Sequence, residues 1–172
     1  YKAEKIIPLL VERIEKAVSK ITADYEIILV EDGGPDHSWA VIESIANSNS
    51  KIQGIKLSRN FGQHPAIMAG LSQAKGEWVV VMDCDLQDQP EEIEKLYAKA
   101  LEGFDIVLAK RKDRKDSFFK KMTSSFFSTV YGYFTDTDYD NEVANFGIYH
   151  RKVIKSILIV VFYKYFCFNY SF

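Results

Sequence analysis

The sequence VVVMDCDLQD at residues 79–88 joins four apolar residues to two carboxylates, Asp83 and Asp85, with one residue between them. Four consecutive apolar residues are typical of a buried strand, and the acidic pair follows where that strand would end. Open α/β folds bind their ligands at the carboxyl edge of the sheet, where two carboxylates can hold a hard divalent cation. The stretch therefore predicts an enzyme that handles a metal-bound phosphate compound.

Helical and strand-like segments alternate on both sides of this stretch. Apolar residues recur at helical spacing between compact apolar runs, and Pro65 and Pro90 stand where a first helical turn tolerates proline. This alternation predicts an α/β fold with a mostly parallel sheet and helices on both faces. The predicted helices cover residues 6–21, 38–46, 65–74, a segment that opens at 90–92 and an amphipathic segment at 117–134; the predicted strands cover 27–30, 52–57, 78–82 and 105–109.

Length and composition narrow the class of protein. The 172 residues suit a single domain, and no linker or repeat divides them. With 22 basic and 24 acidic residues, the chain has no global positive field, which argues against a nucleic-acid partner. Cys84 and Cys167 form no zinc or disulfide spacing, and Cys84 between two aspartates is best kept reduced, which favours the cytoplasm.

The end of the chain, residues 157–172, is an apolar and aromatic tail with one lysine. It is shorter than the roughly 20 apolar residues that a bilayer-spanning helix needs. Three interpretations stay open: the start of a membrane-associated segment, an interfacial belt of aromatic residues, or a buried strand.

Three oxygen-bearing side chains form the candidate metal site. Asp83 and Asp85 point the same way on an extended backbone, and Gln87 adds a neutral oxygen on the same side. Mg²⁺ or Mn²⁺ accepts such ligands and keeps positions open for a diphosphate. The alternative is a solvated acidic turn in which Asp88 caps the helix that starts at Pro90.

Two further motifs follow predicted strands. VEDGGPD at residues 30–36 places an acidic pair and two glycines at a strand end, which suits a nucleobase or ribose. Its alternative is a plain turn with Asp36 or Ser38 as the helix cap. In LSRNFGQH at residues 57–64, Arg59 is a candidate phosphate clamp, and His64 is interpreted as a helix-start residue.

With these blocks in place, the chain resembles family 2 glycosyltransferases. VEDGGPDHSW, LSRNFGQHPAIMAGL, VVVMDCDLQDQPEEI and RKDRKDSFFKKMTSSFF occur in the family's order, and the resemblance runs from Tyr1 to about Ile157. They are most similar to the polyprenyl-phosphate branch, the dolichol-phosphate mannose synthases and the bacterial undecaprenyl-phosphate sugar transferases. The resemblance implies a GT-A nucleotide-binding fold, a nucleotide-diphosphate sugar as donor, and a role in cell-envelope glycan synthesis at the inner face of the cell membrane.

The resemblance also implies roles for individual residues. Asp83, Asp85 and Asn145 would be catalytic, and Asp83, Asp85 and Gln87 would hold the metal. The nucleotide sugar would contact Tyr1, Glu31, Asp32, Arg59, Gly62 and Asp83, and the acceptor phosphate would lie near Arg111, Arg114 and Ser117.

The chain departs from the family pattern in three places. Tyr1-Lys2-Ala3-Glu4 is similar to the end of the family's opening motif, so the first strand of the sheet is expected to be missing. Glu31 replaces the usual first aspartate of its motif. Asn145 stands where many relatives have an aspartate discussed as a base, and beyond Ile157 the family commonly continues with amphipathic and transmembrane helices.

Asn145 bears on the choice of acceptor. A neutral amide cannot take the proton of an attacking sugar hydroxyl, whereas a phosphate monoester, with a second pKa near ~6, is already ionised at neutral pH. The basic residues at 110–115, followed by phenylalanines, fit a charged head group on an apolar chain. A polyprenyl phosphate is therefore the preferred acceptor, at a membrane surface.

Three other functions remain open: transfer to a sugar hydroxyl, a relative that binds nucleotide sugar without turnover, and a phosphohydrolase that uses Asp83 as its nucleophile. The oligomeric state also stays open.

Overall fold

A computed structural model describes residues 3–110 and 143–167, with side chains described for 3–109 and 146–159. Helices and strands alternate through the first of these ranges, as the sequence predicts. The elements are α1 (Ile7–Val18), β1 (Ile27–Glu31), α2 (Ser38–Ser48), β2 (Ile52–Lys56), α3 (Gln63–Gln73), β3 (Trp78–Val81), the 3₁₀ helix η1 (Pro90–Glu92), α4 (Ile93–Ala100), β4 (Ile106–Lys110), β5 (Val143–His150) and α6 (Arg151–Cys167).

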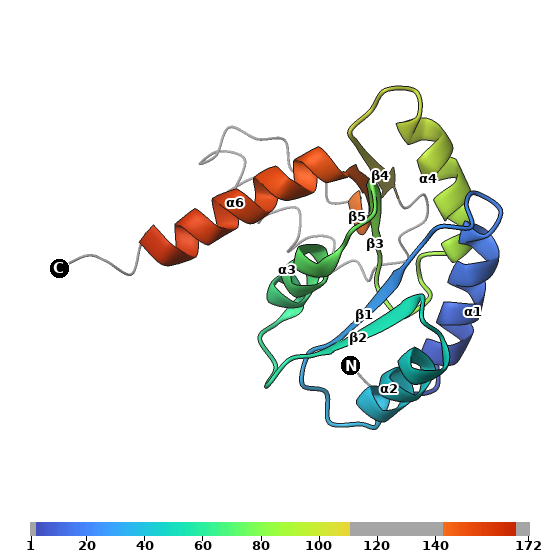
Figure 1. Ribbon diagram of the computed structural model, residues 1–172, viewed down its shortest axis with the longest axis vertical. Coiled ribbons are helices and arrows are strands. Elements are labelled where there is room, and N and C mark those ends of the chain that lie inside the picture. Colours follow the sequence, from blue (N-terminus) through green and yellow to red (C-terminus); the bar gives the residue numbers. More distant parts are fainter. Residues whose placement is uncertain (1–2, 111–142, 168–172) are drawn as a thin grey trace, which may run out of the picture.

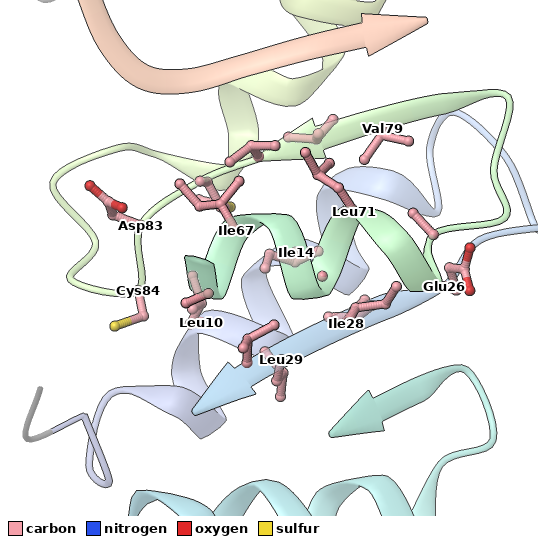
Figure 2. Close-up of a pocket in the computed structure, with 18 of the residues that line it drawn as sticks. Leu10, Ile14, Glu26, Ile28, Leu29, Ile67, Leu71, Val79, Asp83 and Cys84 are labelled. Atoms are coloured by element: carbon pink, nitrogen blue, oxygen red, sulfur yellow. The ribbon is translucent and has the colours of Figure 1, made fainter. Parts of the chain in front are cut away.

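The strands form two sheets. β1 and β2 pair in parallel, with Ile27 opposite Ile52, and β5 lies between β3 and β4 and runs antiparallel to both. β3 and β4 therefore share one direction. Figure 2 shows that β1 and β3 also run the same way, so among the described strands four are co-directional and β5 opposes them. The α/β architecture predicted from sequence is confirmed.

Helices cover both faces of the sheets. Helices α1, α2 and α4 lie on one face, and α3 and α6 lie on the other (Figure 1). One apolar cluster joins α1 and α2 to the parallel pair, and a second packs α4 against β5, where Phe146 and Ile148 are almost fully buried. Burial of this kind contributes about 25 cal/mol per Å² of apolar surface, and it holds the strand ends in place.

The two sheets are separated by a cavity of about 1030 Å³ between β1 and β3. No strand of the described ranges pairs with the cavity-facing edge of either one. The cavity is closed on its faces by apolar residues of α1 and α3, including Leu10, Ile14, Ile67 and Leu71 (Figure 2).

The structure differs from the sequence prediction at several elements, and α1 ends at Val18 rather than at residue 21. β5 was not predicted. α3 begins at Gln63 rather than Pro65. The N–H groups of a helix's first turn have no partner within the helix, so Pro65 can stand in that turn without loss of a hydrogen bond. The tail was open to interpretation as a buried strand, and this is wrong up to Cys167, because these residues form the end of α6.

Two other predictions concern membrane association and the segment at 117–134. Among the described helices, none combines the length and the hydropathy needed to cross a bilayer. The predicted amphipathic helix at 117–134 and the tail from 168 onward lie outside the described residues.

Candidate functional site

The carboxyl end of β1 presents two acidic side chains with different partners. Glu31 is 8% exposed, and its carboxylate accepts a hydrogen bond from the backbone N–H of Gly34. Asp32 reaches the loop that precedes α3, where its two carboxylate oxygens accept the N–H groups of Phe61 and Gly62 at 2.7 and 2.8 Å. Asp32 thereby fixes the backbone of that loop.

The turn after Asp32 packs directly on the same loop. Gly33 has φ of +65°, and a Cβ at this position would lie 2.6 Å from the carbonyl carbon of Arg59 and against the backbone nitrogen of Asn60. Only glycine permits both this conformation and this approach. The end of β1 and the loop 59–62 therefore form one interlocked unit.

Helix α3 starts from this unit and reaches β3. Gly62, with φ of +97°, turns the chain into the helix, and the Gln63 side-chain amide donates a hydrogen bond of 2.7 Å to Oδ1 of Asp83. The Arg59 guanidinium lies 4.9 Å from the centre of the Phe61 ring, and both side chains are exposed. Arg59 is thus an exposed residue of this loop, accessible to a phosphate.

The loop after β3 carries the candidate metal ligands. Asp83 is half-buried, whereas Asp85 and Gln87 are exposed. Oδ1 of Asp85 accepts the backbone N–H of Gln87 at 3.0 Å, and Leu86 between them has φ of +60°. A left-handed leucine costs about 1–2 kcal/mol, and such strain is concentrated at binding sites in folded proteins.

The side-chain oxygens of Asp83, Asp85 and Gln87 are suitable donors for a hard cation. Carboxylate and amide oxygens are the donors that Mg²⁺ and Mn²⁺ prefer. Within the described residues, no three His, Cys, Asp or Glu side chains gather closely enough to hold a metal. A metal at this loop would therefore rest on two carboxylates, the neutral Gln87 and the phosphates of its substrate.

The structure brings four of the predicted nucleotide-binding residues together. Glu31, Asp32, Gly62 and Asp83 line the same cavity, whose remaining wall is largely apolar. In Figure 2 Asp83 and Cys84 mark one end of the cavity and Glu26 marks the other. The predicted nucleotide-binding residues thus gather at the end where β1 and β3 terminate, and Glu26 belongs to the opposite end.

The remaining predicted site residues either do not line the cavity or have no described side chain. Arg59, Asp85 and Gln87 do not line the cavity. The backbone of Asn145 lies in β5, but its side chain is not described. Tyr1, Arg111, Arg114 and Ser117 lie outside the described residues.

In the structure the two helix-cap positions are occupied by other residues than the alternative interpretations named. The cap residue of α2 is His37, and that of η1 is Gln89, and neither cap makes a side-chain hydrogen bond. Asp36 instead accepts the Ser38 hydroxyl at 2.8 Å, which holds the pKa of that carboxyl below its ordinary value. Asp88, although 5% exposed, is not the cap of the segment that begins at Pro90.

Sequence reasoning assigned no role to Gln63. The signal was present, because Gln63 follows β2 at the same sheet edge at which Asp83 follows β3. A long polar side chain in the first turn of the intervening helix can reach the neighbouring strand end, and this spacing alone could have indicated the contact.

Comparison with known proteins agrees with these motifs and with the fold. A family model described as glycosyl transferase family 2 matches residues 1–161, which is most of the chain. The chain belongs to this family. The resemblance stated from the motifs is therefore confirmed.

Curated relatives place the chain in one part of the family. It is 39% identical, over 159 residues, to an undecaprenyl-phosphate 4-deoxy-4-formamido-L-arabinose transferase of Proteus mirabilis (strain HI4320), and the match covers 92% of this chain and 49% of the relative. A relative with the same name from Aeromonas hydrophila subsp. hydrophila is 37% identical, with the same coverage. The chain thus spans about half the length of these relatives.

A solved structure confirms the fold. The crystal structure of S. aureus TarS 1-349 matches with a TM-score of 0.57 and 21% identity, covering 91% of this chain and 46% of that one. At this identity the match supports the GT-A architecture alone.

Proposed function

We propose that this chain forms the donor-binding part of a metal-dependent, inverting glycosyltransferase that moves a sugar from a nucleotide-diphosphate sugar to a polyprenyl phosphate. The observation that carries the proposal is the meeting of three motifs at the common carboxyl edge of the two sheets. There, Asp32 holds the loop 59–62, and Gln63 of that loop's helix contacts Asp83. Nucleotide sugars bind at such an edge in open α/β folds.

Each motif would have its own task. The β1 end, with Glu31 and Asp32, would face the base and ribose, and Arg59 would approach the phosphates. Asp83, Asp85 and Gln87 would hold Mg²⁺ or Mn²⁺, which, when bound, would neutralise the leaving diphosphate. Hydrogen bonds hold Asp32 and Asp83 before substrate arrives, so these two groups would need little reorganisation during the reaction.

The acceptor follows from ionisation and from the relatives. Inversion requires the acceptor oxygen to attack the anomeric carbon opposite the diphosphate. A phosphate monoester needs no base for this, whereas a sugar hydroxyl does, and an amide such as Asn145 cannot supply one. The names of the relatives make undecaprenyl phosphate the first acceptor to test and 4-deoxy-4-formamido-L-arabinose the first sugar. Such an acceptor would place the complete enzyme at the cytoplasmic face of a membrane.

Two measurements test the proposal in sequence. The first is thermal unfolding with UDP or GDP, with and without MnCl₂, because ligand at 100 times its dissociation constant stabilises a protein by ~2.7 kcal/mol. We expect stabilisation by one nucleotide that depends on the metal. The second offers the matching nucleotide sugar with undecaprenyl phosphate or with free sugars as acceptors.

The outcomes separate the candidate functions. Transfer to a sugar hydroxyl but not to undecaprenyl phosphate overturns the acceptor assignment. Nucleotide binding without transfer to either acceptor identifies a binding relative. Phosphate trapped covalently on Asp83 identifies a phosphohydrolase.

A further inference from the structure

We infer that Gln63 is a positioning residue for the metal site: it orients Asp83, and its own place is fixed from β1 by Asp32. The inference rests on the proposed function and extends it to Gln63, to which neither the sequence motifs nor the relatives' names assign a role.

The first step is the contact between Gln63 and Asp83. The amide Nε2 of Gln63 donates to Oδ1 of Asp83 at 2.7 Å, although the two residues are 20 positions apart. A hydrogen bond to an ionised carboxylate is stronger than one between neutral groups. One oxygen of Asp83 is therefore held by the protein, and this sets the direction in which the carboxylate faces a cation.

The second step is the anchoring of Gln63. It is the first residue of α3, and the two residues before it donate their N–H groups to the carboxylate of Asp32. Gly33 packs against the backbone of the same loop at a distance that excludes a Cβ. The start of α3 is thus fixed to β1 by two independent contacts.

The third step is the gap between the sheets. Because the described strands β1 and β3 are not hydrogen-bonded to each other, the sheet itself does not set the spacing of their ends. A chain of contacts spans the cavity between β1 and β3 at the end where the proposed ligand groups lie. It runs from Asp32 through the loop 59–62 to Gln63 and Asp83. It links the proposed nucleotide end of the site to the proposed metal end.

The expected effect follows from metal sites in general. Ligating carboxylates are usually hydrogen-bonded by a neighbouring side chain, and loss of that partner weakens metal affinity by about 10–100-fold. Gln63→Leu removes the donor and leaves every proposed ligand in place. We therefore expect it to weaken Mn²⁺ binding by about 10-fold or more while leaving metal-free nucleotide binding unchanged.

The experiment measures Mn²⁺ binding by electron paramagnetic resonance in the presence of UDP or GDP, with metal-free nucleotide affinity by calorimetry. Gln63→Met, which keeps the side-chain length, is the second variant in case leucine disturbs the start of α3. Gln73→Leu, an exposed glutamine at the other end of the same helix, is the matched control and should behave like the unaltered chain.

Two results would overturn the inference alone. One is a Mn²⁺ affinity in both Gln63 variants that equals that of the unaltered chain. The other is a loss of Mn²⁺ affinity that is accompanied by a loss of thermal stability and by a matching loss of metal-free nucleotide affinity. The second result would mean that Gln63 supports the fold rather than the metal. If the unaltered chain shows no metal-dependent nucleotide binding, the proposed function itself fails.

Discussion

Gly33 is the residue at which the geometry of the site is most sensitive to a single atom. Its φ of +65° and its contact with the backbone at residues 59–60 impose two separate costs on any side chain. Gly103 provides the comparison, because its φ is +105° and a Cβ there would meet nothing within 4 Å. The pair therefore separates backbone strain from steric displacement.

We expect Gly103→Ala to lower the free energy of unfolding by about 1 kcal/mol, from strain alone. Gly33→Ala should cost about 3 kcal/mol, because the added methyl must also displace the loop. Urea denaturation measures both values. Equal losses in the two variants would mean that the loop 59–62 yields readily and is not locked to β1.

At the scale of elements, an ion pair connects α1 to the segment that follows the candidate metal loop. The Arg13 guanidinium donates to both carboxylate oxygens of Glu91 in η1, at 2.8 and 2.6 Å. These hydrogen bonds lower the pKa of Glu91 from 4.5 to about 2. Because the folded-state pKa is the lower one, the pair stabilises the fold fully above about pH 4.5, and this stabilisation is lost as pH falls towards 2.

We therefore expect Glu91→Gln to be less stable than the unaltered chain at pH 6, with the difference shrinking steadily between pH 4.5 and pH 2. Both side chains are partly exposed, so the effect should be small and should decrease in high salt. Chemical denaturation across this pH range measures it, with Glu43→Gln on the exposed side of α2 as the control. A difference that stays constant down to pH 2 would contradict the assignment.

The elements also show what a sequence can and cannot predict. Strands β1, β3 and β4 were predicted because each contains a short apolar run, and the ends of β1 and β3 carry motifs. β5 was missed because VANFGIYH, with Asn145 and Gly147 among its apolar residues, has no compact apolar run. That glycine is required by packing, since a Cβ at Gly147 would lie 2.7 Å from the Leu108 side chain, and no local pattern reveals such a contact.

The site was predictable to the same extent. Residue type and position after a strand identified Glu31, Asp32, Asp83 and Asp85, because strand direction brings such ends to one edge. The contacts of Asp32 with residues 61 and 62, and of Gln63 with Asp83, depend on how α3 leaves its loop. The direction in which α3 leaves its loop depends on the packing of Gly33 and on the backbone conformation of Gly62, which the sequence alone does not reveal.

The molecule as a whole is built around two sheets that face one cavity, and backbone hydrogen exchange should report this division. The N–H of Ile27 donates to the carbonyl of Lys51, at the start of β2. Because successive N–H groups of a strand point to opposite sides, those of Ile28 and Val30 point towards the cavity that both residues line. No described strand receives them.

We accordingly expect the amides of Ile28 and Val30 to exchange faster than those of Ile27 and Leu29 in the same strand. Ile148 serves as the protected reference, because it is 1% exposed and lies in β5 between two partner strands. Exchange followed by NMR measures each amide separately, so unequal rates within β1 cannot arise from global unfolding, which exposes all of them together. Equal protection along β1 would show that the N–H groups of Ile28 and Val30 are hydrogen-bonded in solution. The division into two sheets would then be wrong.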